Sequence, residues 1–129
     1  MEHTMSINLQ RPIVPAIGMK MLSGNTRLLG IPKQRVQVVM ILPQIIEFND
    51  ELKNAIDFFK DRAESFIVTS STQEECEEVI TAFNIKDNLV SNEYKDFAKT
   101  FTIKEQNGLL QKGLMIIDTN CQITHKEML

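Results

Sequence analysis

The sequence predicts an α/β fold in which helices flank a central mixed sheet. Two observations support this prediction. Residues 36–42 (VQVVMIL) form an apolar, β-branched run, which is typical of a strand buried on both faces. Beyond this run, segments with the spacing of amphipathic helices alternate with further strand patterns and end in a strand pair. That order favours a sheet whose faces are covered by helices.

Composition limits the class of protein. A chain of 129 residues can bury a sufficient core without disulfides or a structural metal. It contains no apolar run of about eighteen residues, and its first ten residues lack the pattern of a signal peptide. We therefore expect a cytoplasmic protein with no membrane partner. The net charge of −3 also disfavours general nucleic-acid binding.

Charged residues and prolines are unevenly distributed along the chain. Residues 1–43 contain all four prolines and carry a net charge of +4, whereas residues 44–96 carry −8. The first third is therefore typical of strands and turns, and the middle of solvated helices. We find no repeat or linker, and we assign residues 1–14 to a flexible N-terminus and residues 15–129 to one domain.

The first half of the chain contains a predicted hairpin and a predicted helix. Residues 19–22 and 27–29 read as two short strands, because Gly24 and Asn25 between them tolerate a tight turn. After the buried strand, Leu52, Ile56, Phe59 and Ala63 recur at helical spacing. This helix is expected to begin at Asn49 or Asp50, whose short side chains can accept the free N–H groups of a first turn.

The second half contains two further helices and two strand regions. Residues 66–70 predict a strand, and Thr72 with Glu75 matches a capping box that opens the next helix. The apolar side of that helix is expected to comprise Cys76, Val79, Ile80 and Phe83. A third helix is indicated by Tyr94, Phe97, Ala98 and Phe101, with Ser91 and Asn92 as its cap. Residues 114–117 and 122–125 predict a terminal hairpin around Asp118–Cys121.

This order of elements resembles the peroxiredoxins, and most closely the bacterial thiol peroxidases. The resemblance rests on the N-terminal hairpin, the buried strand that stops at Pro43, and the terminal hairpin with Met115–Asp118 and Gln122–Ile123. It implies a thioredoxin-like, peroxiredoxin-type sheet without the usual last helix. The apolar surface that such a helix covers, and the loops around the active site, imply a homodimer.

The resemblance also implies where the reactive groups should lie. The family places a threonine four residues after its proline and a peroxidatic cysteine three residues later, with an arginine from a more distant segment. Pro43 matches, but Glu47 stands at the threonine position, Asp50 at the cysteine position and Glu93 at the arginine position. A carboxylate cannot attack a peroxide as a thiolate does, and clustered acids repel an anionic intermediate. The resemblance therefore implies a domain without peroxidase activity that acts as a binding or regulatory protein.

Glu47 and Asp50 also have a simpler interpretation. Acids are common at helix N-termini, where they cap N–H groups and interact with the positive end of the dipole. A functional alternative is a carboxylate pair with a raised pKa, or an aspartate that imitates an oxidised cysteine.

The two cysteines allow another class of function. Cys76 lies on an apolar helix face and reads as a buried, unreactive thiol, although the family places its resolving cysteine on this helix. Cys121 lies in the final turn and is expected to be exposed. The alternative function is an antioxidant thiol peroxidase that uses Cys76 or Cys121, with thioredoxin or a small thiol as reductant. A disulfide between the two is not expected in the cytoplasm.

Other residues suggest no further chemistry. His3 and His125 have no neighbouring groups in sequence that would make them bases or ligands, and no zinc spacing, phosphate-binding glycine loop or Ser/His/Asp set occurs. We therefore expect no metal and no cofactor. A remaining interpretation is an interaction module whose opposite charges in the first third and the middle support contacts with a protein partner or a second copy.

Overall fold

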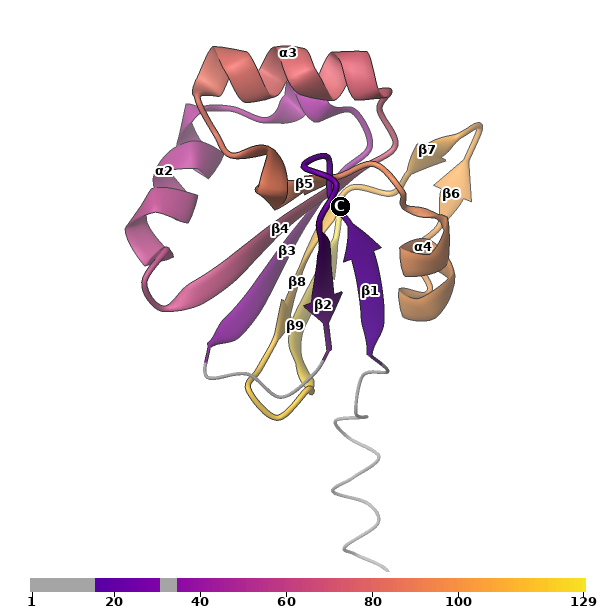
Figure 1. The fold of residues 1–129 in the computed structure, drawn as a ribbon. Helices are drawn as coiled ribbons and strands as arrows, with labels where there is room; N and C mark the ends of the chain where they lie inside the picture. Colours follow the sequence, from indigo (N-terminus) through magenta and orange to yellow (C-terminus); the bar gives the residue numbers. More distant parts are fainter. Residues whose placement is uncertain (1–15, 31–34) are drawn as a thin grey trace, which may run out of the picture.

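A five-stranded mixed sheet forms the centre of the protein (Figure 1). The computed structural model describes residues 16–30 and 35–129, so the predicted flexible segment 1–14 lies outside the described residues. The strand order is β5-β4-β3-β8-β9. The strands are β3 (Val36–Leu42), β4 (Ala63–Thr69), β5 (Val90–Ser91), β8 (Gly113–Ile117) and β9 (Ile123–Met128). Strand β3 pairs in parallel with β4 and antiparallel with β8, so the sheet is mixed as predicted.

Two layers cover the faces of this sheet (Figure 1). Helices α2 (Asp50–Phe59) and α3 (Gln73–Phe83) pack on one face. The other face is covered by helix α4 (Lys95–Phe101) and by an antiparallel hairpin of β1 (Ile17–Lys20) and β2 (Thr26–Leu29). The chain is thus a three-layer α/β domain, which confirms the predicted fold class. No helix in the described residues is long and apolar enough to cross a membrane.

The core has two clusters that meet at β3. The first core cluster, on the side of the hairpin and α4, includes Val39, Ile41, Phe66, Phe97 and Met115. The second core cluster, on the side of α2 and α3, includes Met40, Leu42, Ile45, Phe48, Ile56, Ile67, Cys76 and Val79. Successive residues of β3 alternate between the clusters because side chains of a strand point to opposite faces. The prediction of a strand buried on both faces is confirmed.

The first two helices, α2 and α3, begin at the capping residues that the sequence predicts. The Asn49 side chain accepts a hydrogen bond from the Leu52 N–H at 2.9 Å and caps α2. Thr72 and Glu75 form the predicted capping box at α3: the Glu75 N–H donates to the Thr72 hydroxyl at 3.2 Å and the Thr72 N–H donates to the Glu75 carboxylate at 2.9 Å. These bonds satisfy N–H groups that lack helical partners.

Three expectations about elements were wrong. Ala63 is the first residue of β4, not part of the preceding helix, because α2 ends at Phe59 and the chain turns through residues 60–62. Helix α4 begins at Lys95 with Tyr94 as its N-cap residue, and Ser91 belongs to β5 instead of a cap. The Ser91 hydroxyl donates to the Lys20 carbonyl at 2.7 Å, so it ties β5 to the hairpin.

Besides β5, four short elements were not predicted. Two are the 3-10 turns η1 (Ile45–Glu47) and η2 (Asp87–Leu89). The others form a small hairpin of β6 (Glu105–Gln106) and β7 (Leu109–Leu110). Its turn, Asn107-Gly108, has φ values of 55° and 79° at its two residues. Asn-Gly is the preferred pair for such turns, so this hairpin had a readable signal in the sequence.

Candidate functional site

The loop between β3 and α2, where the peroxidatic position was predicted, is pinned to the domain by backbone and apolar contacts. The Ile45 N–H donates to the Ser71 hydroxyl at 2.8 Å. Ile45 and Phe48 are buried in the second core cluster, and the Phe48 ring meets Phe83 edge-on at 5.2 Å between centroids. Ile46, between them, is 77% exposed. The loop therefore has a fixed conformation and turns an apolar side chain outward.

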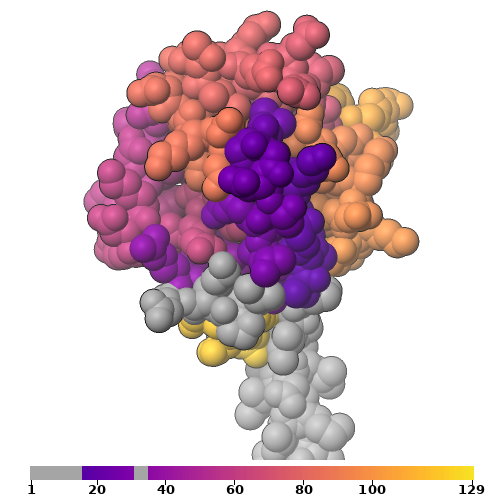
Figure 2. Space-filling view, in the orientation of Figure 1, coloured from indigo at the N-terminus to yellow at the C-terminus, as the bar shows by residue number. Residues whose placement is uncertain are grey.

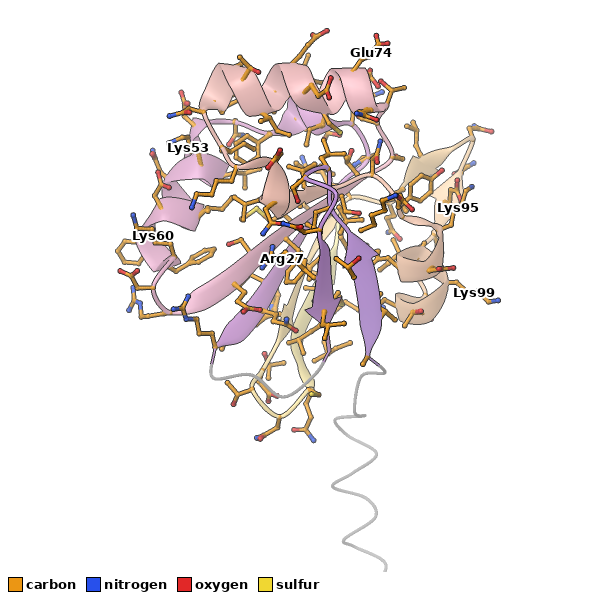
Figure 3. All side chains as sticks on the ribbon, in the orientation of Figure 1. Arg27, Lys53, Lys60, Glu74, Lys95 and Lys99 are labelled. Carbon is orange, nitrogen blue, oxygen red and sulfur yellow. The ribbon has the colours of Figure 1, made fainter. Side chains whose placement is uncertain are left out.

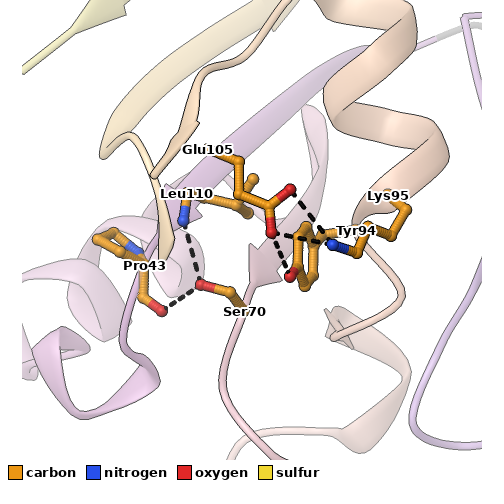
Figure 4. Close-up of polar contacts among 6 residues, drawn as sticks. All are labelled: Pro43, Ser70, Tyr94, Lys95, Glu105 and Leu110. Atoms are coloured by element: carbon orange, nitrogen blue, oxygen red, sulfur yellow. Dashed lines mark hydrogen bonds and ion pairs between the residues drawn. The ribbon is translucent and has the colours of Figure 1, made fainter. Parts of the chain in front are cut away.

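Pro43 lies at the carboxyl end of β3, where three segments are joined by one hydroxyl (Figure 4). The Ser70 hydroxyl donates to the Pro43 carbonyl at 2.7 Å and accepts from the Leu110 N–H at 3.2 Å. One side chain thus connects the residues that follow β3 and β4 with β7. Pro43 therefore marks the start of the loop between β3 and α2.

Glu47 is engaged in two polar contacts. Its carboxylate accepts a hydrogen bond from the Gln44 N–H at 3.2 Å and lies 3.2 Å from the Lys112 ammonium. The first contact closes η1 and the second joins the loop to the residue before β8. The structure thus gives Glu47 a capping role, although at η1 and not at α2.

Asp50 is exposed at the first turn of α2. The cap itself is Asn49, so Asp50 interacts with the helix only through the favourable placement of a carboxylate near the positive end of the dipole. Within the described residues its carboxylate has no hydrogen bond or ion pair. The chain thus presents a solvated carboxylate at the first turn of α2.

Glu93 lies in the connection between β5 and α4 and points toward the hairpin. Its carboxylate is 4.0 Å from the Lys20 ammonium of β1, with both side chains more than half exposed. Glu47 and Glu93 therefore each face a different lysine. None of four cavities on the described surface is lined by Glu47, Asp50 or Glu93. The three acids do not converge on any of these cavities.

A polar cluster beside the loop was not anticipated from the sequence (Figure 4). The Tyr94 hydroxyl donates to Glu105 at 2.7 Å, and the Lys95 ammonium lies 3.0 Å from the same carboxylate. Hydrogen bonds from Tyr94 and Lys95 lower the pKa of Glu105, and the bond to Glu105 raises the pKa of Lys95. The signal was the Asn107-Gly108 turn, which closes the β6–β7 hairpin that contains Glu105.

Cys76 is fully buried on the inner face of α3. Burial raises the pKa of its thiol from 9.0 to about 11, and the nearby carboxylates of Glu75 and Glu77 act in the same direction. At neutral pH only about one such thiol in ten thousand is ionised. Since the thiolate is the nucleophile, Cys76 has the properties of an inert packing residue.

This shift predicts a pH dependence of stability. Between about pH 9 and about pH 11 the unfolded chain loses the Cys76 proton while the folded chain retains it, so unfolding becomes more favourable as pH rises. We expect the free energy of unfolding to fall across this window in the wild type, and to fall less in Cys76→Ala. Urea titrations of both proteins between about pH 8 and about pH 10.5 measure the difference. Identical pH profiles would contradict a buried, protonated thiol.

Cys121 is buried, 4% exposed, so the expectation that it is exposed was wrong. It adopts φ 63°, the left-handed conformation that favours glycine, in the turn between β8 and β9. The Asp118 carboxylate fixes this turn by accepting from the Asn120 and Gln122 N–H groups at 2.9 Å each. Both cysteines are free thiols.

The histidines and acids suggest no metal chemistry in the described residues. His125 is exposed on β9, and its Nε2 lies 3.5 Å from the Glu127 carboxylate. His125 therefore has an acidic neighbour, which the sequence did not predict. His3 lies outside the described residues. No group of three or more His, Cys, Asp or Glu side chains within residues 16–30 and 35–129 is arranged to hold a metal ion.

Comparison with known proteins gives matches in structure only. No protein-family model matches the chain, and no curated protein sequence matches it. Among solved structures, a peroxiredoxin-like protein from Aquifex aeolicus is similar at a TM-score of 0.67 and 17% identity, over 89% of this chain and 72% of that one. Peroxidoxin BcpB from Mycobacterium tuberculosis is similar at a TM-score of 0.70 and 11% identity, over 92% and 83% of the two chains.

A thiol peroxidase is also among the similar structures. The enzyme from Chromobacterium violaceum superimposes with a TM-score of 0.68 at 11% identity, over 91% of this chain and 74% of that one. At such identities the likeness is one of fold. The chain has the thioredoxin fold in the form found in peroxiredoxin-like proteins and thiol peroxidases.

Proposed function

We propose that this chain is a thiol peroxidase-like domain without peroxidase activity, which acts by binding or regulating a protein partner. The observation that carries the proposal is Asp50, an exposed carboxylate at the first turn of α2. In a peroxidase of this fold, that turn holds a thiolate, which the helix dipole helps to ionise. A carboxylate at the same turn is stabilised there but cannot take up and release an oxygen atom as sulfur does.

The placement of the two thiols supports the proposal. Cys76 and Cys121 are the only cysteines of the chain, and both are buried. A redox thiol must meet peroxide and then a reductant, so it has to be accessible and ionised. Cys76 is neither, and Cys121 is buried. The alternative, an antioxidant enzyme served by thioredoxin or a small thiol, would require one of them to open to solvent. Free buried thiols also favour the reducing cytoplasm as the location.

Peroxide consumption tests this function. With hydrogen peroxide and excess dithiothreitol, we expect the wild type to consume peroxide no faster than a control without protein. An active thiol peroxidase run in parallel shows that the assay responds. Peroxide consumption by the wild type that disappears in Cys76→Ser or Cys121→Ser would overturn the proposal and support the antioxidant alternative. Mass spectrometry after sub-stoichiometric peroxide would then show a sulfenic acid at the responsible cysteine.

We further propose that the protein is a homodimer that associates through the loop between β3 and α2. Ile46 supports this, because a 77% exposed isoleucine is held outward by a loop whose neighbours Ile45 and Phe48 are buried. Exposed apolar groups on a rigid loop are suited to an interface core.

Sedimentation velocity tests the dimer. We expect the wild type to sediment as a dimer at about 100 μM, and Ile46→Glu to sediment as a monomer, because a buried unpaired charge is costly at an interface. Phe58→Glu is the matched control, since Phe58 is equally exposed but lies on α2, away from the loop. A monomeric wild type, or an Ile46→Glu variant that remains dimeric, would contradict this assignment.

A further inference from the structure

A cavity of about 420 Å³ opens between α2, the start of β4 and residues 84–89, which follow α3. Figure 2 shows this hollow between α2 and the β1–β2 hairpin. Five basic residues line it: Arg27, Arg35, Lys53, Lys60 and Lys86. Figure 3 places Arg27 on β2 on one side of the opening, and Lys53 on α2 and Lys60 directly after it on the other side.

The cavity lining has a net positive charge, whereas the whole chain has a net negative charge. Its carboxylates are Asp57 and Glu64, so the lining carries a formal +3 in a protein whose net charge is −3. Asp57 already pairs with Lys53 at 3.2 Å, and Glu64 accepts a hydrogen bond from Gln37 at 3.0 Å. Within the described residues, Lys60 and Lys86 make no ion pair.

The concentration of bases is notable because the surrounding sequence is acidic. Residues 44–96 contain five basic residues against thirteen acids, and three of the five line this cavity. The fold adds Arg27 and Arg35 from the basic first third. A concave surface with one dominant sign of charge raises the local concentration of ions of the opposite sign.

Arg27 is fixed in orientation before any ligand arrives. Its guanidinium donates through Nη1 to the Ser65 carbonyl at 2.7 Å and the Asn88 carbonyl at 3.2 Å, and lies 3.9 Å above the Phe66 ring. Burial lowers its pKa, with Glu64 opposing the shift, so the charge is partly desolvated. A guanidinium has five N–H donors, and one held in this way binds an oxyanion with little further loss of side-chain entropy.

Part of the remaining wall is apolar. Ile56, Ala63, Ile85 and Leu89 line the cavity beside the charged groups. Its volume falls in the range of small-molecule sites, which combine apolar walls with a few placed polar groups. An inorganic ion would leave this wall in contact with water, whereas an organic anion would cover it.

We propose that this cavity binds a small phosphomonoester, with the phosphate against Arg27, Lys60 and Lys86 and a compact apolar body against Ile56 and Leu89. A phosphomonoester carries a charge of about −1.5 to −2 at neutral pH, which matches the excess of basic groups better than one carboxylate does. The arginine fork and two ammonium groups suit its oxygens. None of the lining residues belongs to the loop between β3 and α2, so this site is independent of the function proposed above.

Phenyl phosphate is a suitable probe, and ¹H–¹⁵N correlation spectra report the site. We expect saturable shifts of the Ser65, Ile85 and Lys86 amides, with affinity at least about tenfold higher than for inorganic phosphate, and no saturable shift with benzyl alcohol. The double variant Lys60→Gln/Lys86→Gln should bind about tenfold more weakly or worse. Both lysines are exposed, so the fold should persist. Lys99→Gln, on α4, is the matched control and should bind as the wild type does.

Three results would overturn the assignment. The first is no saturable shift at these amides up to about 10 mM phenyl phosphate. The second is equal affinity for inorganic phosphate and phenyl phosphate, which would show that the apolar wall does not contribute to binding. The third is unchanged binding in the double lysine variant.

Discussion

Replacing Phe66 by alanine should lower the free energy of unfolding by about 3–5 kcal/mol. Phe66 is fully buried in β4 and belongs to the first core cluster. Its truncation removes a large apolar group from a strand paired on both sides, so the surroundings can relax only partly into the cavity. It also removes the ring beneath the Arg27 guanidinium. For a domain whose total stability is about 5–15 kcal/mol, this is a large fraction.

Phe58→Ala provides the matched control for this change. Phe58 is 77% exposed on α2, and its ring interacts with the Arg62 guanidinium at 5.1 Å. Loss of this exposed contact should cost about 1 kcal/mol or less. Urea unfolding monitored by circular dichroism compares the two variants. A Phe66→Ala variant no less stable than Phe58→Ala would show that β4 is not the centre of the core.

Replacing Gln37 by leucine should cost about 2–4 kcal/mol despite the gain of an apolar side chain in the core. Gln37 is 1% exposed on β3. Its amide nitrogen donates to the Leu28 carbonyl at 2.9 Å, and its amide oxygen accepts from the Gly30 N–H at 2.9 Å. It thus holds the end of β2 to the sheet. Leucine fills a similar volume but leaves these backbone groups without their partner.

Gln106→Leu separates the hydrogen-bond effect from the change in side chain. Gln106 is exposed in β6, and the same substitution there should change stability by about 0.5 kcal/mol or less. Urea unfolding of the two variants measures the contrast. Within the described residues no buried side-chain nitrogen or oxygen lacks a hydrogen-bond partner, so Gln37→Leu would break an otherwise complete set. Equal stability of the two variants would count against this role of Gln37.

The elements that the sequence predicted well are those with short-range causes. The run Val36–Leu42 is a strand with the predicted bounds because every residue in it is apolar or β-branched except Gln37. Thr72 and Glu75 form their cap because both groups lie within one turn. Ala63 was misplaced because its spacing from Phe59 fits a helix, whereas its pairing with Val36 is a contact between distant segments.

The candidate site was less predictable because it depends on the orientation of side chains and on contacts between residues that are distant in sequence. The resemblance to the peroxiredoxins directed attention to Pro43, Glu47 and Asp50, which lie between the end of β3 and the start of α2, but no local pattern says that Glu47 faces Lys112. Cys121 was expected to be exposed because it lies in a turn. It is buried instead, in a turn that the Asp118 carboxylate holds through two backbone N–H groups. The basic cavity was missed because its residues are scattered from position 27 to 86 and meet only in the folded chain.

Strand β9 limits how two copies of this protein can meet. It is an edge strand, and its middle residues His125, Lys126 and Glu127 are exposed. An antiparallel pair of such edges, centred on Lys126, would set the Lys126 side chains of the two copies against one another on the same face of the joined sheet, where their like charges repel. A continuous ten-stranded sheet across two copies is therefore disfavoured. The charged edge also protects the chain from open-ended growth into fibrils.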